Sequence, residues 1–265
     1  MITFSCFVPH PPIIIPDIGR DELKKVNDTI SALEKLADDL ADFEPETILI
    51  ISPHGLLDPA VFALGFANKM FGDLGSFGSQ YSLELPGDYK LANDIVETSR
   101  KNDFRAEIID HQNDIYYLDH GVLVPLYYLL EKLDYKPEVL PIGYSGSSRA
   151  AHFSFGQTIT DVIANSDKRV AIVASGDLSH NLITERNSGG ESGKIFDAAI
   201  VENIKNYNPS AIINIDEELQ KEAGECGYRS LLILLGILDG EKVKSELLSY
   251  EAPWGVGYMV ARFDH

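Results

Sequence analysis

Five of the seven histidines in this 265-residue chain lie where a loop or a helix start is expected beside a strand or a buried helix. His10 and His54 follow apolar segments in FVPHPPIIIP and IISPHG. His120 precedes an apolar segment in LDHGVLVPL, and His180 ends VASGDLSH, whereas His111 has no such motif around it. One histidine of this kind is most often a neutral ring held in a core or a loop. Four of them beside short motifs predict a common site.

Metal binding is the chemistry that this pattern favours. Two imidazoles on neighbouring strand ends, joined by one acid, form a 2-His-1-carboxylate site that leaves open positions on a metal such as ferrous iron. We expect His10 and His54 to supply the imidazoles, because ligands bind at the ends of strands in a doubly wound sheet. Prolines on both sides of His10 stiffen its loop and direct its ring.

The carboxylate is predicted to come from Glu225 in KEAGECGYRSLLILLG, where an acid between glycine-containing turns opens an apolar helix. A simpler interpretation is that Glu225 is a helix-start acid favoured by the macrodipole. Asp177 is the rival ligand, although its position three residues before His180 also suits a capping or orienting role.

The elements that position these residues predict an α/β fold, because short β-branched segments alternate with longer helical patterns. Strands are expected over 2–8, 46–52, 61–68, 80–84, 105–109, 139–144 and 170–175, with a terminal hairpin over 242–263. Helices are expected over 21–43, 89–101, 121–133, 150–164, 195–206 and 228–238. The chain has no internal repeat and no linker-like segment, so residues 1–265 are predicted to form a single domain.

Composition and charge narrow the possible partners. The chain is 45% hydrophobic and carries 22 Lys and Arg against 41 Asp and Glu, a net charge of -19 that disfavours nucleic acid and anionic membranes. No apolar segment approaches the length of a membrane span, and the N-terminus lacks the features of a signal peptide. Two cysteines, Cys6 and Cys226, do not suggest a secreted disulfide scaffold, so a cytoplasmic location is expected.

Together, the segments PHPP, SPH, LDHG, SGDLSH and ECGYRS resemble the class III extradiol ring-cleavage dioxygenase superfamily, which includes the protocatechuate-type catalytic subunit. The resemblance implies a three-layer α/β/α fold around a mixed, mostly parallel central sheet. It also implies an Fe(II) ion, with zinc possible in the purified protein, bound by His10, His54 and Glu225. A small catecholic or aminophenolic substrate, O2 and a homo-oligomeric state follow from the same relationship.

The resemblance also gives roles to the remaining motif residues. His180 becomes the acid/base histidine, because an imidazole can take a phenolic proton and return it. His120 becomes a histidine that contacts the substrate or supports the metal ligands, and Asp177 would fix the tautomer of His180. Arginines at 149, 186 and 229 are candidates for binding a substrate carboxylate, although each is more simply a solvated surface residue.

One branch of the superfamily is especially similar. The forms GDLSH and ECGYRS resemble the group found beside or fused to AMMECR1-type and radical-SAM proteins. In the related Memo-like proteins a cysteine can occupy the metal site, and here Cys226 directly follows Glu225. The alternative function is therefore a zinc- or copper-binding protein, acting as a hydrolase or as a non-catalytic partner of AMMECR1-type and radical-SAM proteins. The chain lacks the P-H-A-G-Y type of segment associated with Memo-like proteins, which favours the dioxygenase.

Overall fold

A mixed eight-stranded sheet forms the centre of the protein. The computed structural model describes residues 1–55, 58–109, 114–183 and 190–265. Within these residues the strand order is β10-β11-β1-β9-β2-β8-β3-β6, and four of the seven neighbouring pairs are parallel. The strands are β1 (Ile2–Val8), β2 (Thr47–Ser52), β3 (Phe62–Gly65), β6 (Ala106–Ile109), β8 (Glu138–Gly143), β9 (Val170–Ser175), β10 (Lys244–Glu251) and β11 (Tyr258–Asp264).

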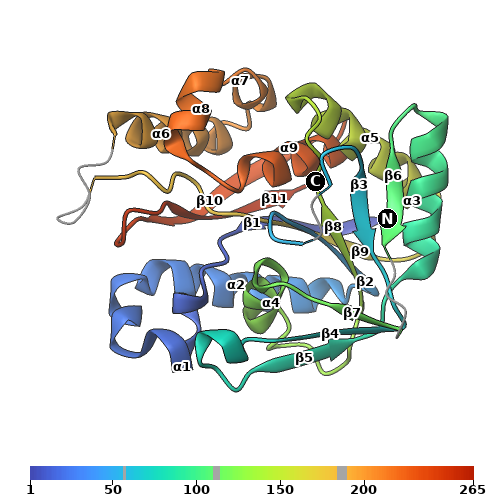
Figure 1. Cartoon of the computed structure of the whole chain (residues 1–265), viewed down its shortest axis with the longest axis horizontal. Helices are drawn as coiled ribbons and strands as arrows, with labels where there is room; N and C mark the ends of the chain where they lie inside the picture. The colour runs from blue at the N-terminus through green and yellow to red at the C-terminus, as the bar shows by residue number, and fades with distance from the viewer. Residues whose placement is uncertain (56–57, 110–113, 184–189) are drawn as a thin grey trace.

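Helices cover both faces of this sheet (Figure 1). One face carries α3 (Tyr89–Lys101), α5 (Arg149–Ala164), α6 (Glu191–Lys205), α7 (Pro209–Ile213), α8 (Glu217–Ala223) and α9 (Tyr228–Ile237). The other carries α1 (Pro16–Gly19), α2 (Asn27–Phe43), α4 (His120–Leu129) and a small sheet of β4 (Lys69–Asp73), β5 (Ser82–Leu85) and β7 (Ile115–Tyr117). A separate hydrophobic core fills each side. The predicted three-layer α/β/α arrangement is confirmed.

Most of the expected elements form, and the differences have local causes. The helix expected from residue 21 begins at Asn27, because residues 20–25 form a 3-10 helix and Val26 leaves the helical region at φ -134°. The two strands expected over 61–68 and 80–84 lie in different sheets. The first joins the main sheet as β3, whereas β5 pairs with β4, which the sequence patterns did not predict. The assignment of one domain stays a prediction.

Two glycines allow α5 and α9 to pack at very short range. A Cβ atom on Gly236 would lie 1.9 Å from the carbonyl oxygen of Phe153, and one on Gly156 would lie 2.2 Å from that of Ile233. These obstructing atoms belong to helix backbones, so relief requires the helices to separate. The contact therefore fixes α9, whose first turn follows the ECG segment.

We expect Gly236→Ala to lower the free energy of unfolding by about 1–3 kcal/mol, the usual cost of overpacking a core. Gly190→Ala is the control for an added methyl group without a clash, because its Cβ would meet no described atom closer than 3.5 Å; any loss there gives the cost of replacing glycine at the N-cap of α6. Urea unfolding of both variants measures the difference. Equal stability of Gly236→Ala and the wild type would show that the helices adjust without cost.

A buried carboxylate links α6 to the loop after β9. Asp197 is 1% exposed, and it accepts hydrogen bonds from the backbone N–H of Ser179 at 2.8 Å and the hydroxyl of Tyr250 at 2.7 Å. Burial raises the pKa of Asp197 to about 6, despite both hydrogen bonds. The folded protein therefore binds a proton here at a pH where the unfolded chain has already lost it.

This raised pKa predicts a pH-dependent loss of stability. Between pH 5 and pH 8 the folded state gives up the Asp197 proton, while the unfolded carboxyl, with a pKa of about 3.9, is ionised throughout, so stability falls as pH rises. Asp197→Asn should remove roughly 1 kcal/mol of that fall. The free energies of unfolding of the variant and the wild type, measured at pH 5 and pH 8, show how much of the fall comes from ionisation of Asp197. An equal fall in both proteins would contradict the raised pKa of Asp197.

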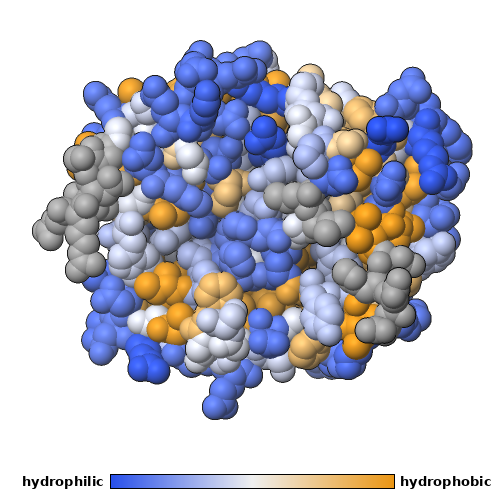
Figure 2. All heavy atoms as spheres, viewed as in Figure 1, coloured by the Kyte–Doolittle hydropathy of each residue, from blue (hydrophilic) through white to orange (hydrophobic). Residues whose placement is uncertain are grey.

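Polar side chains dominate the outer surface of the layer formed by α6, α7 and α8 (Figure 2), in keeping with the acidic composition. In the described part of the chain, no helix combines the length and apolar character that crossing a membrane requires.

Candidate metal centre

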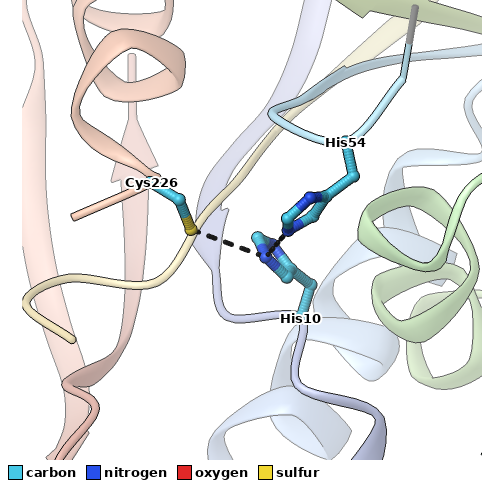
Figure 3. Close-up of side chains that lie close together, drawn as sticks. All are labelled: His10, His54 and Cys226. Carbon is cyan, nitrogen blue, oxygen red and sulfur yellow. Dashed lines mark hydrogen bonds between the residues drawn. The ribbon is translucent and has the colours of Figure 1, made fainter. Parts of the chain in front are cut away.

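The site lies where three adjacent parallel strands end. Strands β1, β9 and β2 are neighbours, and the loops after them carry His10, Asp177 and His54. Cys226 reaches the same point from the turn before α9, and Figure 3 shows its sulfur and both imidazoles converging. Residues separated by more than 200 positions in the chain therefore share one edge of the sheet.

His10 is held in a defined tautomer. Its ring is 2% exposed, and Nδ1 lies 2.9 Å from Oγ of Ser175. That hydroxyl donates its single proton to the carbonyl oxygen of Gly121 at 2.5 Å, so it accepts from Nδ1–H of His10. Nε2 is consequently left with a lone pair, which faces the other donor atoms. Burial, followed by the neighbouring histidines, holds the pKa of His10 well below its usual range and keeps the ring neutral.

The separations between donor atoms fit a metal ion. Nε2 of His54 lies 3.0 Å from Nε2 of His10, and Sγ of Cys226 lies 3.6 Å from the same nitrogen (Figure 3). Two nitrogens about 2.1 Å from one ion are about 3.0 Å apart at right angles and about 3.4 Å apart in a tetrahedron. A thiolate about 2.3 Å from that ion lies about 3.6 Å from a tetrahedral nitrogen. His10, His54 and Cys226 therefore form a suitable donor set.

Glu225, the predicted carboxylate ligand, faces away from this donor set. Its Oε2 accepts from the backbone N–H of Tyr228 at 2.5 Å, and its Oε1 accepts from the side chain of Gln220 at 2.8 Å. One oxygen is thus bonded at the start of α9, as in the simpler helix-start interpretation, and the other is bonded by Gln220 of α8. Because successive residues in this turn point in different directions, the thiol of Cys226 takes the position expected for the carboxylate of Glu225.

Asp177 and His180 adjoin the donor set. Oδ1 of Asp177 accepts from the backbone N–H of His10 at 3.1 Å, while Oδ2 lies 3.9 Å from Nε2 of both His10 and His180. Together with Cys226, they form a second group of donors within 4.8 Å of one another. Burial raises the pKa of Asp177 to about 7. Burial and the nearby His54 lower the pKa of the partly exposed His180, so its ring is neutral at neutral pH.

His120 completes the cluster of rings. Its centroid lies 4.2 Å from that of His54 and 5.6 Å from that of His10. The ring of His120 also packs against that of Phe77, with 5.4 Å between the ring centroids, and 43% of the Phe77 surface is exposed. The four motif histidines are therefore brought together as predicted, with an aromatic ring at the margin of the site.

Residues that support the site were not identified from the sequence. Ser52 and Ser175 end β2 and β9, and each hydrogen-bonds to a site loop and to the start of α4. In the sequence, these two serines are marked only by their positions, two residues before His54 and Asp177 respectively. His111 and Arg186 lie outside the described residues. Arg149 donates to backbone carbonyl groups of residues 213 and 215, so its guanidinium is largely engaged within the fold.

The comparisons with known proteins agree with this architecture. Protein CA_C1420 of Clostridium acetobutylicum is 34% identical over 97% of this chain and 56% of its own length. A 2,3-dihydroxyphenylpropionate/2,3-dihydroxicinnamic acid 1,2-dioxygenase of Mycolicibacterium smegmatis is 29% identical over 66% of the chain and 56% of its own length. A MEMO1 family protein of Methanosarcina mazei is 26% identical over 55% of the chain and 51% of its own length.

These curated relatives are longer proteins, of which the chain spans little more than half. A solved structure, that of an uncharacterized protein JW3007 from Escherichia coli, shares the fold with a TM-score of 0.69. It is 18% identical, and the similarity covers 99% of this chain and all of the other. The family described as the catalytic LigB subunit of aromatic ring-opening dioxygenase matches residues 5–261. The chain therefore belongs to this family of aromatic ring-opening dioxygenase subunits.

Proposed function

We propose that the chain is a non-haem Fe(II) dioxygenase that opens the aromatic ring of a catecholic or aminophenolic substrate with O2. The observation that supports this most is the pair of Nε2 atoms 3.0 Å apart, in a chain that belongs to a ring-opening family. The metal would supply the binding and activation of both reactants. A homo-oligomeric state, a cytoplasmic location and an AMMECR1-type or radical-SAM partner stay predictions.

Within this proposal His10, His54 and Cys226 hold the ion, so Cys226 replaces Glu225 as the third ligand. The supporting evidence is the 3.6 Å separation between Sγ and Nε2 of His10, set against the hydrogen bonds that occupy Glu225. Burial raises the pKa of the Cys226 thiol, and a bound cation would be needed to favour its thiolate form.

His180 would manage the substrate proton. Its neutral ring is partly open to solvent and lies beside the buried carboxyl of Asp177, which suits an imidazole that accepts a phenolic proton and later returns it. Asp177 would orient that ring, and His120 with Phe77 would contact the aromatic substrate. These roles use groups that already surround the donor set.

Cys226 favours a second candidate function. A thiolate with two imidazoles suits zinc or copper(I) better than the hard ligands of a 2-His-1-carboxylate site do. The chain would then resemble its MEMO1 family relative and act as a zinc hydrolase or as a non-catalytic metal-dependent partner. Metal content after anaerobic purification, followed by oxygen uptake with a panel of catechols, separates these functions.

The ligand assignment predicts opposite effects for two adjacent residues. Cys226→Ala should weaken metal binding by more than about a hundredfold, as should His10→Ala and His54→Ala, because each removes a donor atom and not only a residue behind one. Glu225→Ala should retain the metal and lose about 1 kcal/mol of stability with its hydrogen bond to the start of α9. Metal content after anaerobic reconstitution and thermal unfolding measure the two effects.

The comparison between these variants decides the third ligand. Loss of metal from Glu225→Ala, with retention in Cys226→Ala, would restore the carboxylate as ligand. Full retention in both His10→Ala and His54→Ala would instead reject the metal centre.

A role for His180 in proton transfer is tested by replacing the ring with an amide. His180→Gln should bind the metal normally and turn over a catecholic substrate about a hundredfold or more slowly, because an amide cannot carry the proton. His265→Gln is the matched control, since that terminal ring hydrogen-bonds to Ser5 outside the site. Oxygen uptake and metal content are measured on the same preparations. Wild-type turnover by His180→Gln would limit His180 to packing, and loss of metal would make it a ligand.

A further inference from the structure

The carboxylate of Asp119 does not perform the function usual for its position. Asp119 is the N-cap residue of α4, where an aspartate normally accepts a hydrogen bond from a backbone N–H of the first turn. Its side chain makes no such bond. Instead, Oδ1 accepts from the hydroxyl of Ser52 at 2.6 Å, while Oδ2 is shielded from solvent and has no hydrogen-bond partner among the described residues. Helix capping therefore does not explain this residue.

Two glycines enclose the carboxylate between the loops of two site histidines. A Cβ atom on Gly55 would lie 3.3 Å from Oδ2 of Asp119. A Cβ atom on Gly121 would lie 2.8 Å from Oδ1, 2.4 Å from Oγ of Ser52 and 3.5 Å from Cδ2 of His54. Each glycine directly follows a histidine of the cluster, and each lets the backbone come close to the carboxylate. Asp119 is consequently adjacent to the imidazole of His54.

Ser52 connects the same carboxylate to the loop of a proposed metal ligand. Its hydroxyl accepts from the backbone N–H of His54 at 3.2 Å and donates to Asp119. Over the described residues, no Lys or Arg lies within ion-pair distance of Asp119. A shielded carboxylate oxygen without a cationic partner or a hydrogen bond is costly, and nearby positive charge offsets that cost. The ion proposed beside His54 would supply such a charge.

We propose that Asp119 is a positioning residue of the metal centre, which fixes the His54 loop through Ser52 and whose negative charge favours a divalent ion over a monovalent one. The inference rests on the metal binding in the proposed function. Asp119 is not a ligand in this arrangement, because its carboxylate faces Ser52 and the two glycines. The side chain of Ser52 lies between this carboxylate and the loop of His54. Residues in this position commonly change metal affinity by about 10- to 100-fold.

The test compares a divalent with a monovalent ion. Asp119→Asn keeps an oxygen that can accept from Ser52 but removes the charge, so zinc affinity should fall about 10- to 100-fold. Copper(I) affinity should fall much less, because the Coulomb energy scales with the charge of the ion. Ser52→Ala keeps the charge and releases the loop, so both affinities should fall by the same factor. Anaerobic competition with a chromophoric chelator measures each affinity without relying on turnover.

Asp216→Asn is the matched control, because Asp216 caps α8 by accepting from the backbone N–H of Leu219 at 2.9 Å, away from the donor set. It should leave both affinities unchanged. Wild-type zinc affinity in Asp119→Asn would overturn the proposal, as would equal losses for the two ions. A fall of more than about 5 °C in the Tm of metal-free Asp119→Asn would also overturn it, by assigning Asp119 to the fold. Absence of metal binding in the wild type would instead reject the proposed function itself.

Discussion

The close approach of Gly176 and Gly227 is the contact on which the candidate site depends. A Cβ atom on Gly176 would lie 2.1 Å from Cα of Gly227, so only glycine lets the loop after β9 rest against the turn before α9. Hydrogen bonds reinforce this contact, because the carbonyl oxygen of Asp177 accepts from the N–H of Gly227 at 2.9 Å and from that of Cys226 at 3.4 Å. The sulfur of Cys226 is thereby held beside His10, and Asp177 is held beside both.

Neutral imidazoles in a strongly acidic protein follow from burial. The net charge of -19 would favour protonated histidines through long-range attraction, but desolvation lowers the pKa of His10, His54 and His120. Neutral imidazole is the form that binds metals, so the rings lose few protons when an ion enters at neutral pH. The tautomer of His10 is also fixed, because the hydrogen bond to Ser175 keeps the proton on Nδ1 and leaves Nε2 free to face the other donor atoms. Desolvation at the site thus outweighs the overall charge in keeping these rings neutral.

The sequence predicted the fold and the positions of the histidines because both depend on strong, local patterns. Hydrophobic runs predicted β1 and β9 to the residue, and strand ends converge wherever parallel strands are adjacent. The direction of a side chain within one turn carries no such pattern, which explains why Glu225 and Cys226 were not distinguished as donors. Asp119 was missed for a related reason: an aspartate before a helix reads as a cap, and only its actual partner, Ser52, shows otherwise.

The proposed replacement of Glu225 by Cys226 as metal donor bears on the chemistry that the family fold can support. The N–H of Tyr228 at the start of α9 and the side chain of Gln220 in α8 occupy both oxygens of Glu225. Moving this carboxylate to the proposed ion would therefore break two hydrogen bonds and reorganise the turn. Turning Cys226 away would instead disturb the N–H of Asp177, which donates to its sulfur at 3.3 Å. Glu225 is thus tied to its present direction by Gln220 and Tyr228, and Cys226 is tied by Asp177, which adjoins the donor set. A hard carboxylate and a soft thiolate favour different ions, so under the proposed function the conformation of this turn would decide which metal is bound.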